Sequence, residues 1–150
     1  MIKYLENNRT FNLESKDSSY IFHISEAGYL IHDYYGKKIE GDLLYLNIVS
    51  EMGGLKRDQF DFDTTFNNTL SEVSSASRGD YRNPSIVIER CDGAIFSRFK
   101  YVSHRIYKGC FKLSNQPCLR SAKETLEVTL KDDFSNAVIK LNYSVYDDLV

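Results

Sequence analysis

The chain has 150 residues, of which 42% are hydrophobic, 13% aromatic and 27% charged, and its net charge is −2. A domain of this size buries roughly 70% of its unfolded surface, and the aromatic content excludes disorder as the main description. The near-zero charge argues against a nucleic-acid binder. The longest apolar stretch, residues 43–49, is far shorter than the ~20 residues that a membrane-spanning helix needs.

The N-terminus and the cysteines indicate a compartment. The first residues contain no apolar segment typical of a secretory signal. Cys91, Cys110 and Cys118 form an odd set without a metal-binding spacing. Because disulfides are rare in reducing compartments, we expect a cytoplasmic protein with free thiols.

Hydrophobic residues recur with a period of two, which is typical of β-strands with one apolar face. In chain order, the first predicted hairpin pairs residues 19–25 with 29–36. The second pairs residues 85–91 with a long aromatic strand, 94–107, through Asp92-Gly93, a dipeptide that favours a tight turn with positive φ.

The third predicted hairpin pairs residues 125–130 with 139–145 through the short polar connection 131–136. No window shows a convincing helical stripe. The sequence therefore predicts an all-β, antiparallel β-sandwich.

Residues 53–83 depart from the alternating pattern. They contain Gly53-Gly54, several Asp and Asn, and a serine-rich patch, 71–77. A connection this long inside a compact domain is usually functional or disordered, and Phe60, Phe62 and Phe66 argue against simple disorder. We expect an ordered excursion that lies against another part of the molecule.

The histidines and cysteines offer weak candidate sites. His23 and His32 lie on adjacent predicted strands and would suit zinc, but no third ligand stands at a recognisable spacing. Polar positions on a sheet face are the simpler interpretation. A nucleophilic pair of Cys91 and His104 is not supported by a local motif. No metal or cofactor is expected.

Seven aspartates are candidates for acid–base or cation chemistry: Asp58, Asp61, Asp63, Asp132, Asp133, Asp147 and Asp148. The last four fall in predicted turns, where aspartate is favoured for its hydrogen bonds to the backbone. The first three lack the glycine and distal glutamate of a calcium loop. A glycosidase needs two carboxyl groups ~5–9 Å apart on rigid elements, and the residues alone show no such pair.

Three ordered stretches nevertheless resemble a known family. They are residues 78–84, which contain Asp80-Tyr81-Arg82-Asn83-Pro84, residues 99–109, which contain Tyr101-Val102-Ser103-His104-Arg105-Ile106-Tyr107-Lys108-Gly109, and residues 124–130, which begin with Glu124-Thr125-Leu126-Glu127. In this order they resemble the N-terminal domain of bacterial α-galactosidases of glycoside hydrolase family 36. Residues 20–38 match as well, so the resemblance covers nearly the whole chain.

The resemblance implies a sandwich of the supersandwich, galactose-mutarotase-like kind that precedes a catalytic (β/α)₈ barrel. In the family the barrel supplies an aspartate nucleophile and an aspartate acid/base for retaining hydrolysis of terminal α-galactosides. Neither barrel motif occurs in residues 1–150. The apolar ending Leu149-Val150 resembles the start of another strand. We therefore expect a non-catalytic N-terminal part whose sandwich is incomplete at the C-terminus.

The family also implies a homo-oligomer in which an N-terminal-domain loop reaches the active site of a neighbouring subunit. The matching segment is residues 57–60. There Asp58 would bind sugar hydroxyls and Phe60 would form a wall of the subsite. The partners implied are the barrel, neighbouring subunits and α-galactoside sugars, with no nucleic acid and no membrane.

Two segments depart from the family pattern. Cys110-Phe111-Lys112-Leu113 stands where a Lys-Pro is usual, and Ser71-Glu72-Val73-Ser74 stands where Gln-Glu-Tyr-Pro is usual. An alternative function is a stand-alone carbohydrate-binding β-sandwich, favoured by 20 aromatic residues on alternating strands. A third is an interaction protein that uses exposed β-edges. Half a sandwich exposes an apolar face, so the isolated chain is expected to self-associate or to be unstable.

Overall fold

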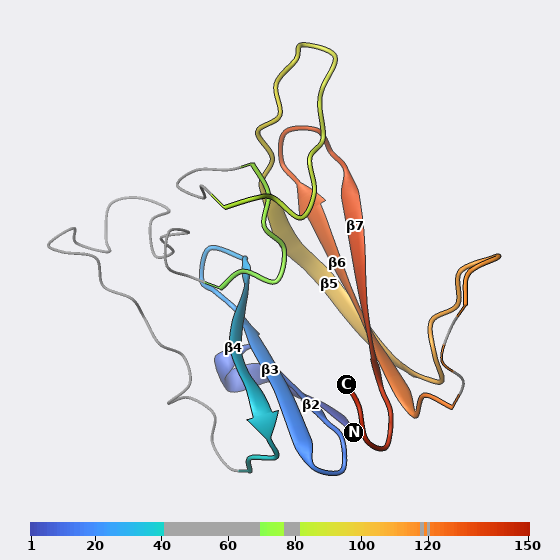
Figure 1. Ribbon diagram of the computed structural model, residues 1–150. Coiled ribbons are helices and arrows are strands. Elements are labelled where there is room, and N and C mark those ends of the chain that lie inside the picture. Colours follow the sequence, from blue (N-terminus) through green and yellow to red (C-terminus); the bar gives the residue numbers. More distant parts are fainter. Residues whose placement is uncertain (41–69, 77–81, 118, 120) are drawn as a thin grey trace, which may run out of the picture.

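The computed structural model describes residues 1–40, 70–76, 82–117, 119 and 121–150, and in these residues the chain forms two antiparallel sheets (Figure 1). The elements are β1 (Ile2–Leu5), η1 (Glu6–Asn8), β2 (Thr10–Glu14), β3 (Ser18–Ile24), β4 (Leu30–Lys37), β5 (Phe99–Lys108), β6 (Glu124–Asp132) and β7 (Val138–Val145). The strand orders are β1-β2-β3-β4 and β5-β6-β7. The predicted all-β, antiparallel sandwich is confirmed. No helix in the described part is long and apolar enough to cross a membrane.

Strands β1 and β2 form an N-terminal hairpin that the sequence pattern did not predict. Ile2 pairs with Leu13 and Tyr4 with Phe11 across a one-turn 3₁₀ segment, which ends at Arg9 in the left-handed conformation (φ 52°). Each strand contributes just two apolar residues to the inner face. Two alternations are too few to distinguish a short strand from a loop, although Phe11 and Leu13 are fully buried.

The hairpins predicted at residues 19–36 and 125–145 are confirmed as β3-β4 and β6-β7. The first contains a register shift between Ile21 and Phe22. In the second, Asp132 is fully buried and accepts hydrogen bonds from Arg98 N (2.5 Å) and from Ser135 N (2.7 Å) and Oγ (2.5 Å). Asp132 therefore has the predicted turn-forming role.

The prediction of a hairpin around Asp92-Gly93 is correct for the turn and wrong for the two strands on either side of it. Gly93 has a φ of 78°, and its N–H donates to Arg90 O at 2.8 Å. Residues 85–91 and 94–98 are nevertheless not strands, and β5 begins at Phe99. Figure 1 shows residues 84–98, here called the first arm, as a long loop whose outer part projects beyond the sheets, while Ile86 and Ile88 pack against the core. A two-stranded ribbon without a third strand or a covering layer is marginal in water.

The core lies where the inner faces of the two sheets meet. Its fully buried members include Phe11 and Phe22 from the four-stranded sheet and Leu126 and Val128 from the other. The Phe22 and Tyr143 rings bring β3 and β7 together at a centroid distance of 5.0 Å. This junction supplies the apolar burial that stabilises the domain.

Backbone contacts also join the sheets. Tyr101 N, near the start of β5, donates to Gly28 O in the β3-β4 turn at 2.8 Å. Gly28 has a φ of 90°, a conformation that glycine adopts without strain. At the opposite end of β6, Ile2 N donates to Glu124 Oε2 at 2.7 Å. The two sheets are thus held at both ends of their interface.

Candidate functional site

The residues predicted to line a sugar site, Asp58 and Phe60, lie outside the described residues. The same is true of Asp61, Asp63 and Cys118. Their roles therefore stay predictions. The candidate residues that the structure describes lie on the two sheets and on residues 70–76.

A buried carboxylate, Glu72, joins the two sheets. Tyr20 on β3 donates to Oε1 and Oε2 at 2.7 and 2.9 Å, and Tyr143 on β7 donates to Oε2 at 2.7 Å. Nδ1 of His32 on β4 lies 3.2 Å from Oε1. We call these four residues the Glu72 cluster.

The backbone around Glu72 explains why its side chain enters this position. His32 N donates to Leu70 O at 2.7 Å, and Glu72 N donates to Leu30 O at 3.1 Å. Residues 70–72 therefore lie along the edge of β4 that faces away from β3, with a bridge between Ser71 and Ile31. This pairing directs the Glu72 carboxylate toward the junction between the sheets.

The electrostatics of the Glu72 cluster favour a structural role. Burial, reinforced by the nearby Glu72 charge, raises the pKa of Tyr20 and of Tyr143 well above the ordinary value, so both phenols stay protonated donors. The hydroxyls of Tyr20 and Tyr143 and Nδ1 of His32 all lie within hydrogen-bond distance of the two Glu72 oxygens. Its oxygens hold three strands together rather than standing free for a sugar hydroxyl.

His23 and His32 do not face a common ligand. His23 pairs with Ile31 and His32 with Phe22, so the two side chains lie on opposite faces of the four-stranded sheet. Nδ1 of His23 lies 2.8 Å from Oδ1 of Asp33. Burial raises the pKa of Asp33 in spite of the neighbouring His23. In the described part of the chain, no three His, Cys, Asp or Glu side chains gather as a metal site would require.

His104 and Cys91 belong to different surroundings. The His104 ring packs on Tyr4 (4.5 Å between centroids) and Phe11 (4.8 Å), and its Nδ1 lies 2.7 Å from the Tyr101 hydroxyl. Burial lowers the pKa of His104 and favours its neutral form. Cys91 lies in the exposed turn of the first arm. The structure therefore assigns His104 to packing between the sheets.

The two family-like motifs on β5 and β6 lie directly opposite each other. Arg105 pairs with Glu127 and Ile106 with Leu126 in the strand register. The Arg105 guanidinium donates to Glu127 at 2.8 Å, and Lys140 Nζ on β7 lies 3.4 Å from the same carboxylate. The hydrogen bond from Arg105 holds the pKa of Glu127 below its ordinary value. These motif residues stabilise the three-stranded sheet.

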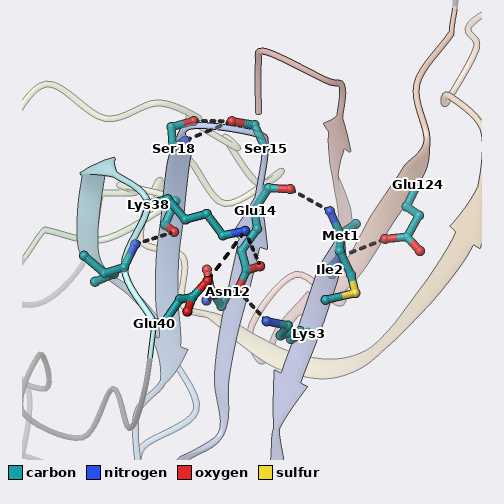
Figure 2. A network of polar contacts seen from close by, with 12 residues as sticks. Met1, Ile2, Lys3, Asn12, Glu14, Ser15, Ser18, Lys38, Glu40 and Glu124 are labelled. Atoms are coloured by element: carbon teal, nitrogen blue, oxygen red, sulfur yellow. Dashed lines mark hydrogen bonds and ion pairs between the residues drawn. The ribbon is translucent and has the colours of Figure 1, made fainter.

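A second buried carboxylate, Glu14, organises the N-terminal hairpin, as Figure 2 shows. Its Oε1 accepts hydrogen bonds from Lys3 Nζ at 2.7 Å and Asn12 Nδ2 at 2.9 Å, and Lys38 Nζ lies 3.6 Å from Oε2. The two lysines reach Glu14 from opposite sides, Lys3 from β1 and Lys38 from the end of β4 (Figure 2). The charges of Lys3 and Lys38 compensate the buried carboxylate.

Sequence reasoning missed the structural roles of Glu14 and Glu72. Glu14 carries no signal, because a charged residue at a polar strand position is usually solvated. Glu72 carries a weak signal. In the segment Ser71-Glu72-Val73-Ser74 it keeps the glutamate of the Gln-Glu-Tyr-Pro pattern, while the other positions differ.

Residues 28–149 match the family model described as Glycosyl hydrolase family 36 N-terminal domain. The chain is 30% identical over 148 residues to alpha-galactosidase 1 of Pediococcus pentosaceus, covering 94% of this chain and 20% of that protein.

Solved structures agree with this match. The galactosidase domain of the alpha-galactosidase–sucrose kinase AgaSK of Mediterraneibacter gnavus superposes with a TM-score of 0.86 at 25% identity, covering 98% of this chain and 21% of that one. A variant of alpha-galactosidase AgaA from Geobacillus stearothermophilus, in complex with raffinose, superposes with a TM-score of 0.78 at 25% identity, covering 92% of this chain and 20% of that one. The chain spans about one fifth of the length of these relatives.

Proposed function

Because the chain belongs to the glycosyl hydrolase family 36 N-terminal domain family, we propose that it is the non-catalytic N-terminal part of an α-galactosidase that hydrolyses terminal α-galactosides. The observation that carries the proposal is the match of residues 28–149 together with the relatives' fivefold greater length. A catalytic barrel in the remaining four fifths would supply the chemistry.

The same proposal gives the chain a role in assembly. Residues 1–150 contribute to a homo-oligomer, and Asp58 and Phe60 form the rim of a neighbouring subunit's active site. The sequence resemblance of residues 57–60 supports this role. The described residues 70–76 supply a rigid anchor at the end of the same stretch, because Glu72 is hydrogen bonded to both sheets.

The proposed location is the cytoplasm. Cys91 and Cys110 are free thiols, which suits a reducing compartment.

The first test is to read the coding sequence that follows Val150 and to assay the complete protein with raffinose. We expect a barrel with two aspartate motifs and release of galactose. A coding region that ends at Val150 would contradict the proposed α-galactosidase, and only the fold assignment would stand.

Isothermal titration of residues 1–150 with galactose and raffinose separates this proposal from a stand-alone sugar-binding module. We expect no measurable heat of binding, since the proposed rim residues act only in a neighbouring subunit's site. Saturable binding by the isolated chain would favour the alternative.

A further inference from the structure

Resting on the proposed function, we propose that the polypeptide segment that follows Val150 in the full-length protein pairs with the outer edge of β7 as an additional antiparallel strand. The outer edge is the one that faces away from β6. In the described residues β7 ends the three-stranded sheet, with β6 on one side and no strand on the other. This chain spans about one fifth of its relatives, so the proposed occupant is part of the same polypeptide.

The backbone of β7 has hydrogen-bonding groups that point away from β6. Asp132 N donates to Ala137 O at 2.9 Å, which makes these two opposite residues a hydrogen-bonded pair. In an antiparallel ladder such pairs alternate with pairs that are not hydrogen bonded. Every second residue from Ala137 therefore bonds to β6, and the N–H and C=O groups of Lys140, Asn142 and Ser144 face outward. An edge of this kind is a template for another strand.

The chain already turns back after β7. Tyr146, which continues the outward-facing series, donates its N–H to Leu149 O at 2.8 Å across Asp147-Asp148. This bond forms only where the chain reverses its direction, and Figure 1 shows the C-terminal residues bending back beyond the end of β7. Lys16 N donates to Asp147 O at 2.7 Å, which fixes the turn against the connection between β2 and β3.

The β2-β3 hairpin shows what such a turn leads to. It is closed by the same kind of bond, from Ser15 N to Ser18 O at 3.0 Å, and β3 pairs with β2 directly from the turn. The same continuation after β7 places Val150 opposite Val145, and opposite residues share one face of a sheet. Val145 is fully buried in the core, and Val150 packs against that core. Val150 therefore lies where the first residue of the returning strand belongs.

The side chains of β7 are less covered than those of β6. Ile139 and Leu141 are only partly buried, whereas Leu130 and Val128, opposite them on β6, are 2% and 0% exposed. The side-chain oxygen of Asn142 is buried without a hydrogen-bond partner among the described residues. A strand beside β7 would bury more of the apolar side chains and bring donors to this oxygen.

Disulfide trapping in the full-length protein tests the pairing and its register. Counted from the bond between Tyr146 and Leu149, Asn142 lies opposite the third residue after Val150. The α carbons of a hydrogen-bonded pair are ~5.5 Å apart, a separation that a disulfide spans. Asn142→Cys, combined with a cysteine at that third residue, should therefore form an intrachain disulfide under mild oxidation. Mass spectrometry of the non-reduced peptides measures its yield.

Val138→Cys with the same second cysteine is the matched control. Position 138 lies four residues away along β7, ~13 Å from the expected register, so we expect at least ~10-fold less disulfide.

Hydrogen exchange of the unsubstituted full-length protein supplies a measurement that no substitution disturbs. The outward amides of Lys140, Asn142 and Ser144 should exchange within about tenfold of the slow rates of the neighbouring amides that bond to β6. An unpaired edge would instead show slow and fast amides in alternation along β7.

Three results would overturn the inference: alternating exchange along β7, an intrachain disulfide that is absent or equally abundant with Val138→Cys, and a disulfide between the Asn142→Cys positions of two chains, which would assign the edge to a second copy. Failure of the proposed function is read separately with raffinose. An active enzyme without the disulfide contradicts the pairing alone, and a longer, inactive chain without a barrel that forms the disulfide contradicts the proposed function alone.

Discussion

The junction between the two sheets and the two arms that leave it both carry large apolar side chains, but only the junction buries them. Phe22 and Leu126 are fully buried, whereas Val87 in the first arm and Leu113 in the connection between β5 and β6, here called the second arm, are more than half exposed. This difference in exposure follows from what lies beside each side chain. A junction strand has a partner strand beside it and the opposite sheet across its inner face, whereas Val87 and Leu113 belong to connections outside the two sheets. Stability therefore resides in the junction, and the arms are available for contacts.

The largest expected effect compares a phenylalanine of each region. Phe22→Ala removes a fully buried ring that packs on Phe11 and Tyr143, so it should lower the free energy of unfolding by ~3–5 kcal/mol. Phe111→Ala, in the second arm, should lower it by less than ~1 kcal/mol. Urea unfolding of the two variants measures both. Equal losses would contradict the division of stability between junction and arms.

The second comparison concerns a carboxylate in each region. Glu72→Gln replaces an acceptor held by Tyr20, Tyr143 and His32, and an amide cannot accept from all three, so ~1–3 kcal/mol should be lost. Glu89→Gln, on the exposed first arm, should stay within ~0.5 kcal/mol of the parent chain. Urea unfolding again measures both. A Glu72→Gln variant as stable as Glu89→Gln would show that the Glu72 cluster does not hold the sheets.

Acid unfolding gives a third comparison. Burial of Asp132 opposes ionisation, but hydrogen bonds from Ser135 and Arg98 outweigh it and lower its pKa from the ordinary value of 3.8. A lowered folded-state pKa contributes stability above pH ~4 that is lost as the pH falls through the folded value. Asp132→Asn should therefore weaken the dependence of the unfolding free energy on pH below ~4.

Asp92 is the control for that experiment. Its pKa is also lowered, first by the N–H of Ala94 and then by Arg90, but it lies in the solvated first arm. Asp92→Asn should leave the pH dependence of the junction nearly unchanged. Equal flattening of the two acid profiles would mean that the arm turn is as tightly coupled to folding as Asp132.

The smallest expected effect compares two ion pairs. Arg105→Ala removes the partner of Glu127 and leaves Lys140 in place, so a small loss of unfolding free energy is expected. Arg90→Ala removes an exposed pair with Asp92 in the first arm and should lower the unfolding free energy even less. Thermal unfolding of the two variants at low and high salt measures both losses. A larger loss for Arg90→Ala would reverse the comparison.

The sequence predicted those strands whose alternation is long enough to be distinctive. Leu126, Val128 and Leu130 alternate with polar residues over a whole strand, and β6 was predicted with its partner. Ile2 and Tyr4 alternate only once, and β1 was missed. The error at residues 94–98 has the opposite cause. Their apolar residues satisfy a strand pattern, but Ile95 and Phe96 remain exposed and residues 94–98 join neither sheet.

The candidate site was predicted less completely, because its described contacts join residues that are far apart in the sequence. Glu72 meets Tyr20 and Tyr143 at separations of 52 and 71 residues, and no local pattern contains that information. Family-like motifs indicated that residues 101–109 and 124–127 matter. They did not indicate that Arg105 and Glu127 form an ion pair across adjacent strands.

By itself, the sequence determined the all-β class, two of the hairpins, the Asp92-Gly93 turn and the family, because these depend on local alternation, turn chemistry and ordered motifs. Tertiary structure alone decided which carboxylates are buried, which histidines share a face, and which apolar residues face solvent. Burial and hydrogen bonding depend on what lies across the junction, and residues adjacent there are far apart along the chain. Leu113 and Leu126 are the same residue type in the sequence, and only the fold leaves one exposed and buries the other in the core.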